Sequence, residues 1–331
     1  MKNKLFVGID VSKAVLDLFV LKLEYYFNVE NSPKGFAGLL EICCNKLSCK
    51  REDLYFCFEH TGRYSRPLSV FLDQAGIMFS EVPPLDIKRS KGLSRGKSDK
   101  TDARDIARYA WRKRDELIPT KMNSAEVSIL RQLLTLREKL IRNRTGYKNS
   151  IKDLKDCFFE GETLFIKQLQ EDLIERLNIK IEKIDKQIED IIRKMPEWNI
   201  NYKLIQTIKG IGPVISKYVI IYTENFTRFK NYRKFACYAG IAPFEYTSGS
   251  SIKGKTRVHP FANKQIKSLL NMGAMNAIKI KGEYRIYYQR RQQQGKNNMS
   301  TLNIIRNKLL SRMFAVVKRQ SPYLDLYRFA A

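Results

Sequence analysis

Near its start the chain reads Leu5-Phe-Val-Gly-Ile-Asp10, an apolar run that ends on a carboxylate, and Leu54-Tyr-Phe-Cys-Phe-Glu59 repeats the pattern. A carboxylate that closes an apolar β-type run lies at a strand end or faces a polar site, because burying it without a partner costs several kcal/mol. Two more acidic residues follow in Lys100-Thr-Asp-Ala-Arg-Asp-Ile-Ala-Arg-Tyr-Ala-Trp111, which has the apolar spacing of an amphipathic helix. Asp102 and Asp105 are three residues apart and therefore share one face of that helix.

Four acidic residues suggest a single metal site: Asp10, Glu59, Asp102 and Asp105. Carboxylates that are brought together repel one another and raise each other's pKa. Two Mg²⁺ ions roughly 4 Å apart would relieve this repulsion and could clamp a scissile phosphate. Any one of the four is equally well explained as an ordinary turn residue. Asp99 has the same spacing from Asp102 but lies beside Ser98 at the expected helix start, which favours an N-cap or first-turn role.

The order of the expected elements is that of the RNase H and RuvC-like nucleases. We expect strands over residues 5–10, 15–21 and 27–31, a helix over 33–47 capped by Ser32, a strand over 54–59, a helix over 64–74, a strand over 77–82, and then the helix with the Asp pair. The predicted fold class is an α/β RNase H/RuvC-like domain over residues 1–120, a helical coiled-coil middle over 121–198, and a mainly α C-terminal domain with a helix-hairpin-helix over 199–331.

The charge balance indicates a nucleic-acid partner. The 331 residues carry 61 Lys and Arg against 34 Asp and Glu, a formal net charge of +27. Eleven of these cations fall between Lys88 and Arg114, so Lys97, Lys100 and Arg104 would rim the acidic site with phosphate-binding charge. Ribosomal and membrane-surface proteins can be equally basic, but neither class explains the four carboxylates.

The sequence indicates an intracellular protein without a membrane partner. We see no signal peptide at the N-terminus and no apolar run near the roughly 20 residues that span a bilayer, and so we expect a cytoplasmic, nucleoid-associated location. The six cysteines match neither a disulfide framework nor paired CxxC zinc ligands. We therefore expect reduced and mostly buried thiols.

The middle of the chain has the apolar period of a coiled coil. After Ile174, alternating steps of three and four residues separate Leu177, Ile181, Ile184, Ile188, Ile191 and Met195. A second apolar helix is expected upstream, from Ser124 to about Phe159. The seam could close an antiparallel hairpin within the chain or could join subunits, and we favour a hairpin that also meets another subunit.

A helix-hairpin-helix is expected after Trp198. Gly210-Ile-Gly212 separates two helical segments, and Pro213 occupies the first position of the second helix. Glycines in such a turn let backbone N–H groups approach a DNA phosphate. A tight turn between two helices that binds nothing would have the same sequence.

Residues 239–257 concentrate small, hydroxyl-bearing and basic side chains in what we interpret as one loop. Lys253, Lys255 and Arg257 suit phosphate binding, although a solvated Ser/Gly loop has a similar composition. A nucleophilic serine is compatible with this segment, but its chemistry alone does not select one.

Five segments together resemble a known family. They are Val7-Gly-Ile-Asp-Val-Ser-Lys13, Phe58-Glu-His-Thr-Gly62, Lys100-Thr-Asp-Ala-Arg-Asp105, Gly240-Ile-Ala-Pro243 and Thr247-Ser-Gly249. In this order and spacing, nearly end to end, the chain resembles the insertion-sequence transposases that join a RuvC-like DEDD domain to a C-terminal serine domain. These are the bridge-RNA-guided recombinases, which are related to the Piv-type DNA invertases.

The resemblance implies roles for particular residues. It implies that Asp10, Glu59, Asp102 and Asp105 bind Mg²⁺ and that Ser248 attacks DNA to form a phosphoserine link. It further implies double-stranded donor and target DNA, a structured guide RNA, and a dimer or tetramer. Residues 257–262 depart from the Arg-x-Ser-Lys-x-Gly run of many relatives, so no role is carried over there. A hydrolytic junction nuclease and a non-enzymatic nucleic-acid scaffold remain the alternatives.

Overall fold

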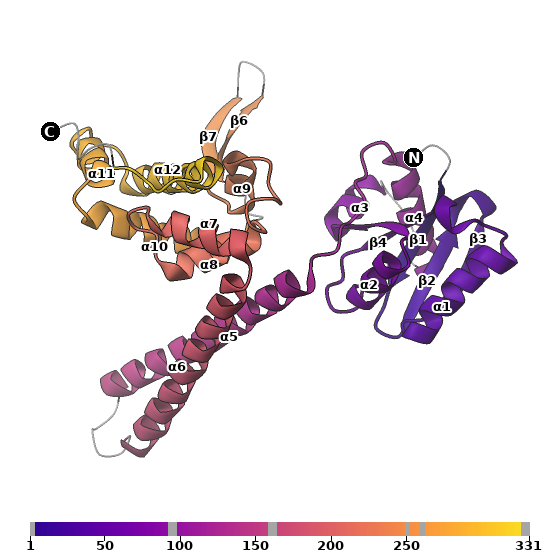
Figure 1. The fold of residues 1–331 in the computed structure, drawn as a ribbon, viewed down its shortest axis with the longest axis horizontal. Coiled ribbons are helices and arrows are strands. Elements are labelled where there is room, and N and C mark those ends of the chain that lie inside the picture. Colours follow the sequence, from indigo (N-terminus) through magenta and orange to yellow (C-terminus); the bar gives the residue numbers. More distant parts are fainter. Residues whose placement is uncertain (1–3, 92–97, 158–163, 249–251, 259–261, 326–331) are drawn as a thin grey trace. The chain divides into compact units, whose positions relative to one another are not determined.

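The protein is described by a computed structural model that forms two compact units, Met1–Asn123 and Ser124–Ala331 (Figure 1). The described residues are 4–91, 98–157, 164–248, 252–258 and 262–325. For residues 155–157, 246–248, 252–253 and 255–257 only the backbone is described.

The first unit is built on a mixed five-stranded sheet with the order β3-β2-β1-β4-β5. The strands are β1 (Leu5–Val11), β2 (Val15–Val20), β3 (Tyr25–Glu30), β4 (Leu54–Glu59) and β5 (Met78–Val82). β1, β2 and β3 form an antiparallel meander, whereas β4 and β5 run parallel to β1. The expected α/β fold class is confirmed for this part of the chain.

Helices cover both faces of the sheet. The helices are α1 (Pro33–Glu41), α2 (Arg66–Gln74), α3 (Pro84–Ser90) and α4 (Asp99–Arg112). α1 and α2 pack on one face, where Leu39 and Leu72 join the alternating apolar residues of the strands in one core. α4 packs on the other face through the buried residues Ala103, Ile106, Ala107 and Ala110.

Several expected boundaries in this unit need correction; among them, the strand expected over residues 27–31 spans Tyr25–Glu30, and the helix expected over 64–74 begins at Arg66. The helix expected over residues 33–47 is N-capped by Ser32 as predicted, but its α-helical part ends at Glu41 and continues as a wider π-type turn over Ile42–Lys46. α3 was not among the expected elements. Pro84 starts this helix, a position where the missing N–H costs nothing.

The second unit begins with a helical hairpin made of α5 (Ala125–Cys157) and α6 (Leu164–Arg193). The two helices run antiparallel, since Arg137 bonds Asp185 near one end and Ser150 bonds Gln170 near the other. The buried stripe of α6 consists of Ile181, Ile184, Ile188 and Ile192. After Ile188 the buried residue is Ile192, whereas the expected Ile191 and Met195 are only partly buried, because a straight α-helix drifts away from a strict 3.5-residue period.

The rest of the second unit is mainly helical, as expected. Its elements are α7 (Pro196–Gln206), α8 (Pro213–Tyr222), α9 (Tyr232–Tyr238), β6 (Pro243–Ser248), β7 (Ile252–Val258), α10 (Lys264–Lys279), α11 (Glu283–Gln293) and α12 (Asn298–Arg319). Buried residues of these helices and of the base of the α5–α6 hairpin form one hydrophobic core. The segment expected as a serine-rich loop is instead an antiparallel hairpin of β6 and β7.

Charged residues fasten the base of the long hairpin to α8. The ammonium of Lys217, only 3% exposed, lies 2.7 Å from Asp185 and 2.9 Å from Glu189 of α6. Arg137 of α5 forms a second ion pair with Asp185, at 2.9 Å.

Among the helices of the described ranges, none is long and apolar enough to cross a membrane.

Candidate active site

The site is positioned by the close packing of α4 on β1 at Gly8. A Cβ atom at Gly8 would lie 2.2 Å from the carbonyl oxygen of Ala103 and 2.3 Å from the amide nitrogen of Ala107. Only glycine therefore allows the backbone of α4 to lie this close to the strand. Asp10 points to the same face of the sheet as Gly8, since side chains alternate along a strand. Asp102 precedes Ala103 and so reaches the same end of β1.

The predicted carboxylates on β1, β4 and α4 act on one another electrostatically. The pKa of Asp10 is raised to about 6, first by burial and then by the negative charges of Asp102 and Glu59, with smaller contributions from Asp99 and Asp17. Glu59 ends β4 beside the end of β1, because Ile9 and Phe58 are paired in the parallel register. The structure thus brings Asp10, Glu59 and Asp102 together.

The fourth predicted residue, Asp105, joins the group through a lysine. The Lys91 ammonium lies 2.7 Å from Oδ1 of Asp102 and 3.7 Å from Oδ2 of Asp105. Burial lowers the pKa of Lys91, but the hydrogen bond that Lys91 donates to Asp102 and the charges of Asp102, Asp105 and Glu59 outweigh this effect and raise the pKa. Lys91 directly follows α3 and was not singled out from the sequence, because it is one of eleven cations in that basic stretch.

The donor chemistry fits a hard divalent cation, although the side chains do not form a finished ion cage. Within residues 4–91, 98–157 and the other described ranges, no three Asp, Glu, His or Cys side chains converge closely enough to hold an ion. Asp102 and Asp105 instead both contact the Lys91 ammonium. The Lys91 ammonium thus provides positive charge to these two carboxylates at the position where the sequence predicts a metal ion.

A fifth carboxylate, Asp17, lies near this group, although no local sequence pattern distinguishes it. Asp17 lies directly opposite Asp10 in the antiparallel pairing of β1 and β2. Its side chain is buried, and the hydroxyl of Tyr26 donates a hydrogen bond of 2.5 Å to it. Asp99 occupies the first turn of α4 behind the Ser98 N-cap, as predicted. Both acidic residues add to the negative field at Asp10.

The predicted basic residues of this unit lie along α4. Lys97 falls outside the described residues. The Lys100 ammonium lies 5.6 Å from the centroid of the Tyr26 ring, in cation–π contact. Arg104 is half-buried one turn further along the helix, and its Nε atom is buried without a hydrogen-bond partner among the described residues.

The two glycines of the predicted helix-hairpin-helix have different surroundings. Gly210, with a φ of +89°, faces α10, where a Cβ would lie 2.6 Å from the carbonyl oxygen of Gly273. Because Gly210 has no side chain, the turn before α8 can pack closely against α10. Gly212 has nothing within 4 Å of a built Cβ and precedes Pro213 at the start of α8. Lys209, beside them, is bound to Asp325 and to the carbonyl of Lys281.

The predicted serine and its basic neighbours belong to the β6–β7 hairpin. Ser248 ends β6 and pairs in register with Ile252, while Thr247 pairs with Lys253. Lys255 and Arg257 follow in β7. The side chains of Ser248, Lys253, Lys255 and Arg257 lie outside the described part of the structure.

Known transposases are similar to this chain in two regions. Residues 7–159 match the IS110-type DEDD transposase family, described as a transposase, and residues 202–289 match the family described as "Transposase IS116/IS110/IS902 family". The pilin gene-inverting protein of Moraxella lacunata is 27% identical over 331 residues, covering 97% of this chain and 98% of that protein. An uncharacterized protein of insertion element IS116 from Streptomyces clavuligerus is 22% identical over 312 residues, covering 74% of this chain and 78% of that protein.

A putative transposase of Sinorhizobium fredii is also similar, at 24% identity over 208 residues, 56% of this chain and 52% of that protein. The two family matches cover the first unit with its carboxylates and the helical part around the β6–β7 hairpin. Both families are described as transposases, and the two matched regions follow one another in the same order as the sequence motifs. The chain therefore belongs to the IS110/IS116 family of transposases, enzymes that cleave and rejoin DNA.

Proposed function

We propose that the protein is an RNA-guided, Mg²⁺-dependent DNA transposase that exchanges strands through a covalent serine–DNA intermediate. The observation that carries this proposal is electrostatic: the charges of Glu59 and Asp102 raise the pKa of Asp10 at the same end of the sheet, and Asp102 and Asp105 share the Lys91 ammonium. Grouped carboxylates would repel a DNA phosphate unless cations were held between them, and carboxylate oxygens are the ligands that Mg²⁺ takes. The similarity to pilin gene-inverting proteins favours site-specific strand exchange over plain hydrolysis.

The carboxylates supply the ligands in this proposal. Asp10, Glu59, Asp102 and Asp105 would hold the ions, two by the usual arrangement for phosphodiester chemistry. Bound there, Mg²⁺ supplies charge neutralisation of the phosphate and a lower barrier to attack on phosphorus. Ion binding would break the contacts of Lys91 with Asp102 and Asp105. The Lys91 ammonium would then lie beside the bound phosphate and stabilise its negative charge. Lys100 and Arg104 add positive charge for the DNA backbone.

Ser248 supplies the nucleophile. Its Oγ forms a bond to the phosphorus of the scissile phosphodiester while one deoxyribose oxygen leaves, and the serine proton replaces the broken bond on that oxygen. The number of phosphoester bonds is unchanged, so a second deoxyribose hydroxyl can reverse the step and rejoin DNA. Lys253, Lys255 and Arg257 would stabilise the charge that develops on the phosphate.

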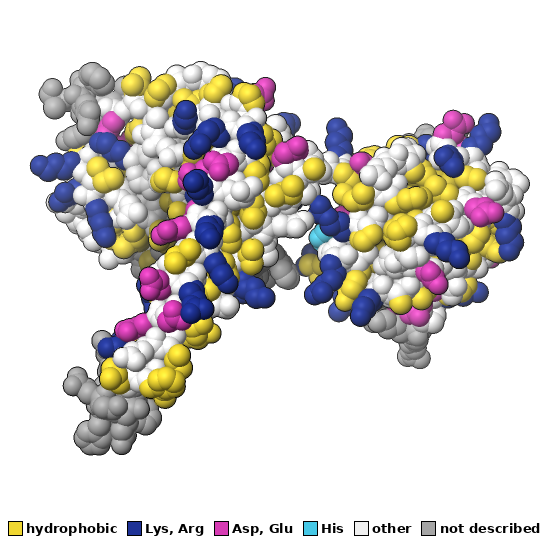
Figure 2. All heavy atoms as spheres, turned by 60° about the horizontal axis from the view of Figure 1, so that its bottom comes forward, with side chains coloured by type: hydrophobic (Ala, Val, Ile, Leu, Met, Phe, Trp, Pro, Cys, Tyr) yellow, Lys and Arg dark blue, Asp and Glu magenta, His cyan; other side chains and the backbone are white. Residues whose placement is uncertain are grey.

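The second unit supplies assembly and DNA contacts in this proposal. The turn at Gly210 and Gly212 acts as a helix-hairpin-helix, with Gly212 at the open side, and residues 121–198 act as a coiled-coil arm beside a transposase part at 199–331. Figure 2 shows hydrophobic side chains, in yellow, near the far end of the arm. Five apolar residues at the start of α6 are exposed: Leu164, Phe165, Ile166, Leu169 and Leu173. They would pack on another subunit to give a dimer or tetramer.

Sequencing of RNA that copurifies with the protein tests the guided part of the proposal. One structured RNA with segments complementary to both donor and target DNA is the expected result, and the protein would act on this DNA in the cytoplasm. Recovery of only random cellular RNA, together with cleavage that needs no RNA, would instead support a hydrolytic nuclease. Binding without any cleavage would support a scaffold.

A further inference from the structure

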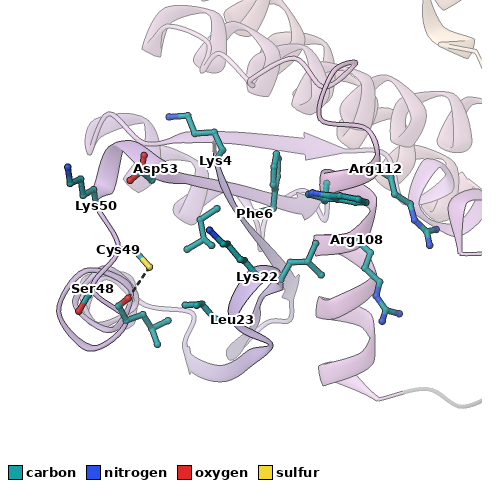
Figure 3. A pocket seen from close by; sticks show the side chains of 14 residues that line it. Lys4, Phe6, Lys22, Leu23, Ser48, Cys49, Lys50, Asp53, Arg108 and Arg112 are labelled. Atoms are coloured by element: carbon teal, nitrogen blue, oxygen red, sulfur yellow. Dashed lines mark hydrogen bonds between the residues drawn. The ribbon is translucent and has the colours of Figure 1, made fainter. Parts of the chain in front are cut away.

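The other end of α4 borders an open pocket of about 1080 Å³ in the first unit. Figure 3 shows Lys22 reaching into its middle, Lys4 and Lys50 on one side, and Arg108 and Arg112 on α4 at the other. The pocket lies at the Leu5 end of β1, whereas Asp10 lies near the opposite end of the strand. It is therefore separate from the carboxylate site.

The positive charge of this pocket is not neutralised by the protein. The side chains of Lys22, Lys50, Arg108 and Arg112 make no hydrogen bond or ion pair with the described residues. Among the described residues that line the pocket, Asp53 is the one carboxylate. Cations left unpaired in a concave surface attract an anionic ligand of complementary shape.

Part of the pocket wall is apolar and exposed. Trp111 is 50% exposed and Leu23 is 47% exposed, although both side chains are apolar. The guanidinium of Arg114 stacks on the Trp111 ring at 4.7 Å from its centroid. An exposed indole beside free cations has the chemistry that a nucleotide needs, a flat apolar surface for the base and positive charge for the phosphate.

A row of side chains on α4 links this pocket with the carboxylates. Lys100, Arg104, Arg108 and Trp111 follow one another at steps of four, four and three residues, which places them along one side of the helix. From Asp102 to Trp111 the helix rises roughly 14 Å. Arg104, in the middle of this row, has a buried Nε atom that bonds nothing among the described residues.

We infer that the pocket and this row bind an unpaired stretch of nucleic acid, with one base stacked on Trp111 and the neighbouring phosphates held by Lys22, Lys50 and Arg108. Duplex DNA is the poorer ligand, because its base faces are covered by their own stacking neighbours. An unpaired segment also bends enough to enter a concave site. The inference rests on the proposed function only for the class of ligand, since binding here needs neither metal nor Ser248.

Tryptophan fluorescence of the full-length protein tests this site directly. The chain has two tryptophans, and Trp198 is only 9% exposed, so a bound base should quench mainly Trp111. The protein would be titrated in EDTA with an oligothymidine, with its RNA counterpart, with a duplex of equal length, and with an abasic oligonucleotide. Both single strands should quench the fluorescence saturably and the duplex and abasic strands only weakly. A preference for RNA would assign the site to a guide RNA, and a preference for DNA to a displaced strand.

Variants separate this pocket from general charge attraction. Trp111→Phe should remove most of the quenching, and Lys22→Ala with Lys50→Ala should weaken single-strand binding, measured by fluorescence anisotropy, about tenfold. The matched control is Lys34→Ala with Arg66→Ala, two exposed cations on α1 and α2 at the other face of the sheet. Three results would overturn the inference. The first is an equal loss of affinity in both double variants, and the second is unchanged single-strand binding by the Lys22/Lys50 variant. The third is quenching by the duplex as strong as that by the single strands.

Asp102→Ala distinguishes this site from the catalytic proposal. It should abolish cleavage and leave the quenching unchanged. Loss of the quenching in this variant would contradict a separate binding site even if the proposed catalytic role of Asp102 were correct.

Discussion

Asp10 and Asp17 face each other across β1 and β2, on the sheet face that α4 covers. Asp17 is buried and accepts a hydrogen bond from Tyr26, whereas Asp10 lies at the candidate active site. The negative charge of Asp17 acts on Asp10 together with the charges of Glu59 and Asp102, and all three raise the pKa of Asp10. Two carboxylates opposed in this way destabilise the sheet unless a proton or a cation is present.

This field predicts a pH dependence of stability. Burial and the neighbouring charges raise the pKa of Asp10 from 3.8 to about 6. The folded chain therefore holds this proton more tightly than the unfolded chain, and stability is lost as the pH rises through 6. In EDTA, wild type should melt at a higher temperature near about pH 5 than near about pH 7.5. Asp10→Asn should lose this difference, and an unchanged pH slope in the variant would refute the assignment.

Gly8→Ala should move α4 away from the sheet. The new Cβ would lie 2.2 Å from the Ala103 carbonyl, a contact that backbone can relieve only by shifting. We expect a loss of roughly 1–3 kcal/mol in the free energy of unfolding, together with a sharp fall in DNA cleavage because Asp102 moves with α4. Gly38→Ala is the matched control, since its Cβ meets nothing within 4 Å inside α1. It should be neutral or stabilise the protein by about 0.5–1 kcal/mol.

Lys91→Met should tighten metal binding. The Lys91 ammonium occupies Asp102 and Asp105, and an incoming ion has to displace it. Calorimetric titration with Mn²⁺ should show affinity raised about tenfold, which corresponds to about 1.4 kcal/mol. The metal-free variant should melt earlier, because the carboxylates lose their counter-ion. Lys113→Met, which removes an exposed pair with Glu116 at the far end of α4, should change neither quantity.

The fold was largely predictable where local pattern and tertiary packing agree. The strand Leu54–Glu59 was predicted to the residue, because an apolar run is bounded by turn residues and by a carboxylate. The metal-site candidates were found because strand ends and a helix face can be read from sequence periodicity. Lys91 and Asp17 could not be found in this way. Their importance depends on cross-strand register and on α3, and no local pattern shows either one.

The arm should support assembly through its far end and stability through its base. Phe165→Ser with Leu169→Ser replaces two side chains that are 70% and 51% exposed. We expect a smaller mass by light scattering and an unchanged melting temperature. Ile184→Asp is the contrasting variant: it introduces a charge at a residue that packs in the core of the second unit, and should lower the melting temperature strongly. An unchanged mass for the double variant would rule out this surface as the subunit contact.

The most direct test of the central claim is a denaturing gel with labelled DNA, Mg²⁺ and the copurified RNA. It compares wild type with Ser248→Ala, Ser250→Ala and Asp102→Ala. The account predicts a covalent protein–DNA band for wild type and Ser250→Ala, and no such band for Ser248→Ala or Asp102→Ala, because the serine attacks a phosphate that the carboxylate site prepares. A band that survives in Ser248→Ala but disappears in Ser250→Ala, or DNA cleavage by wild type without any covalent band, would contradict it.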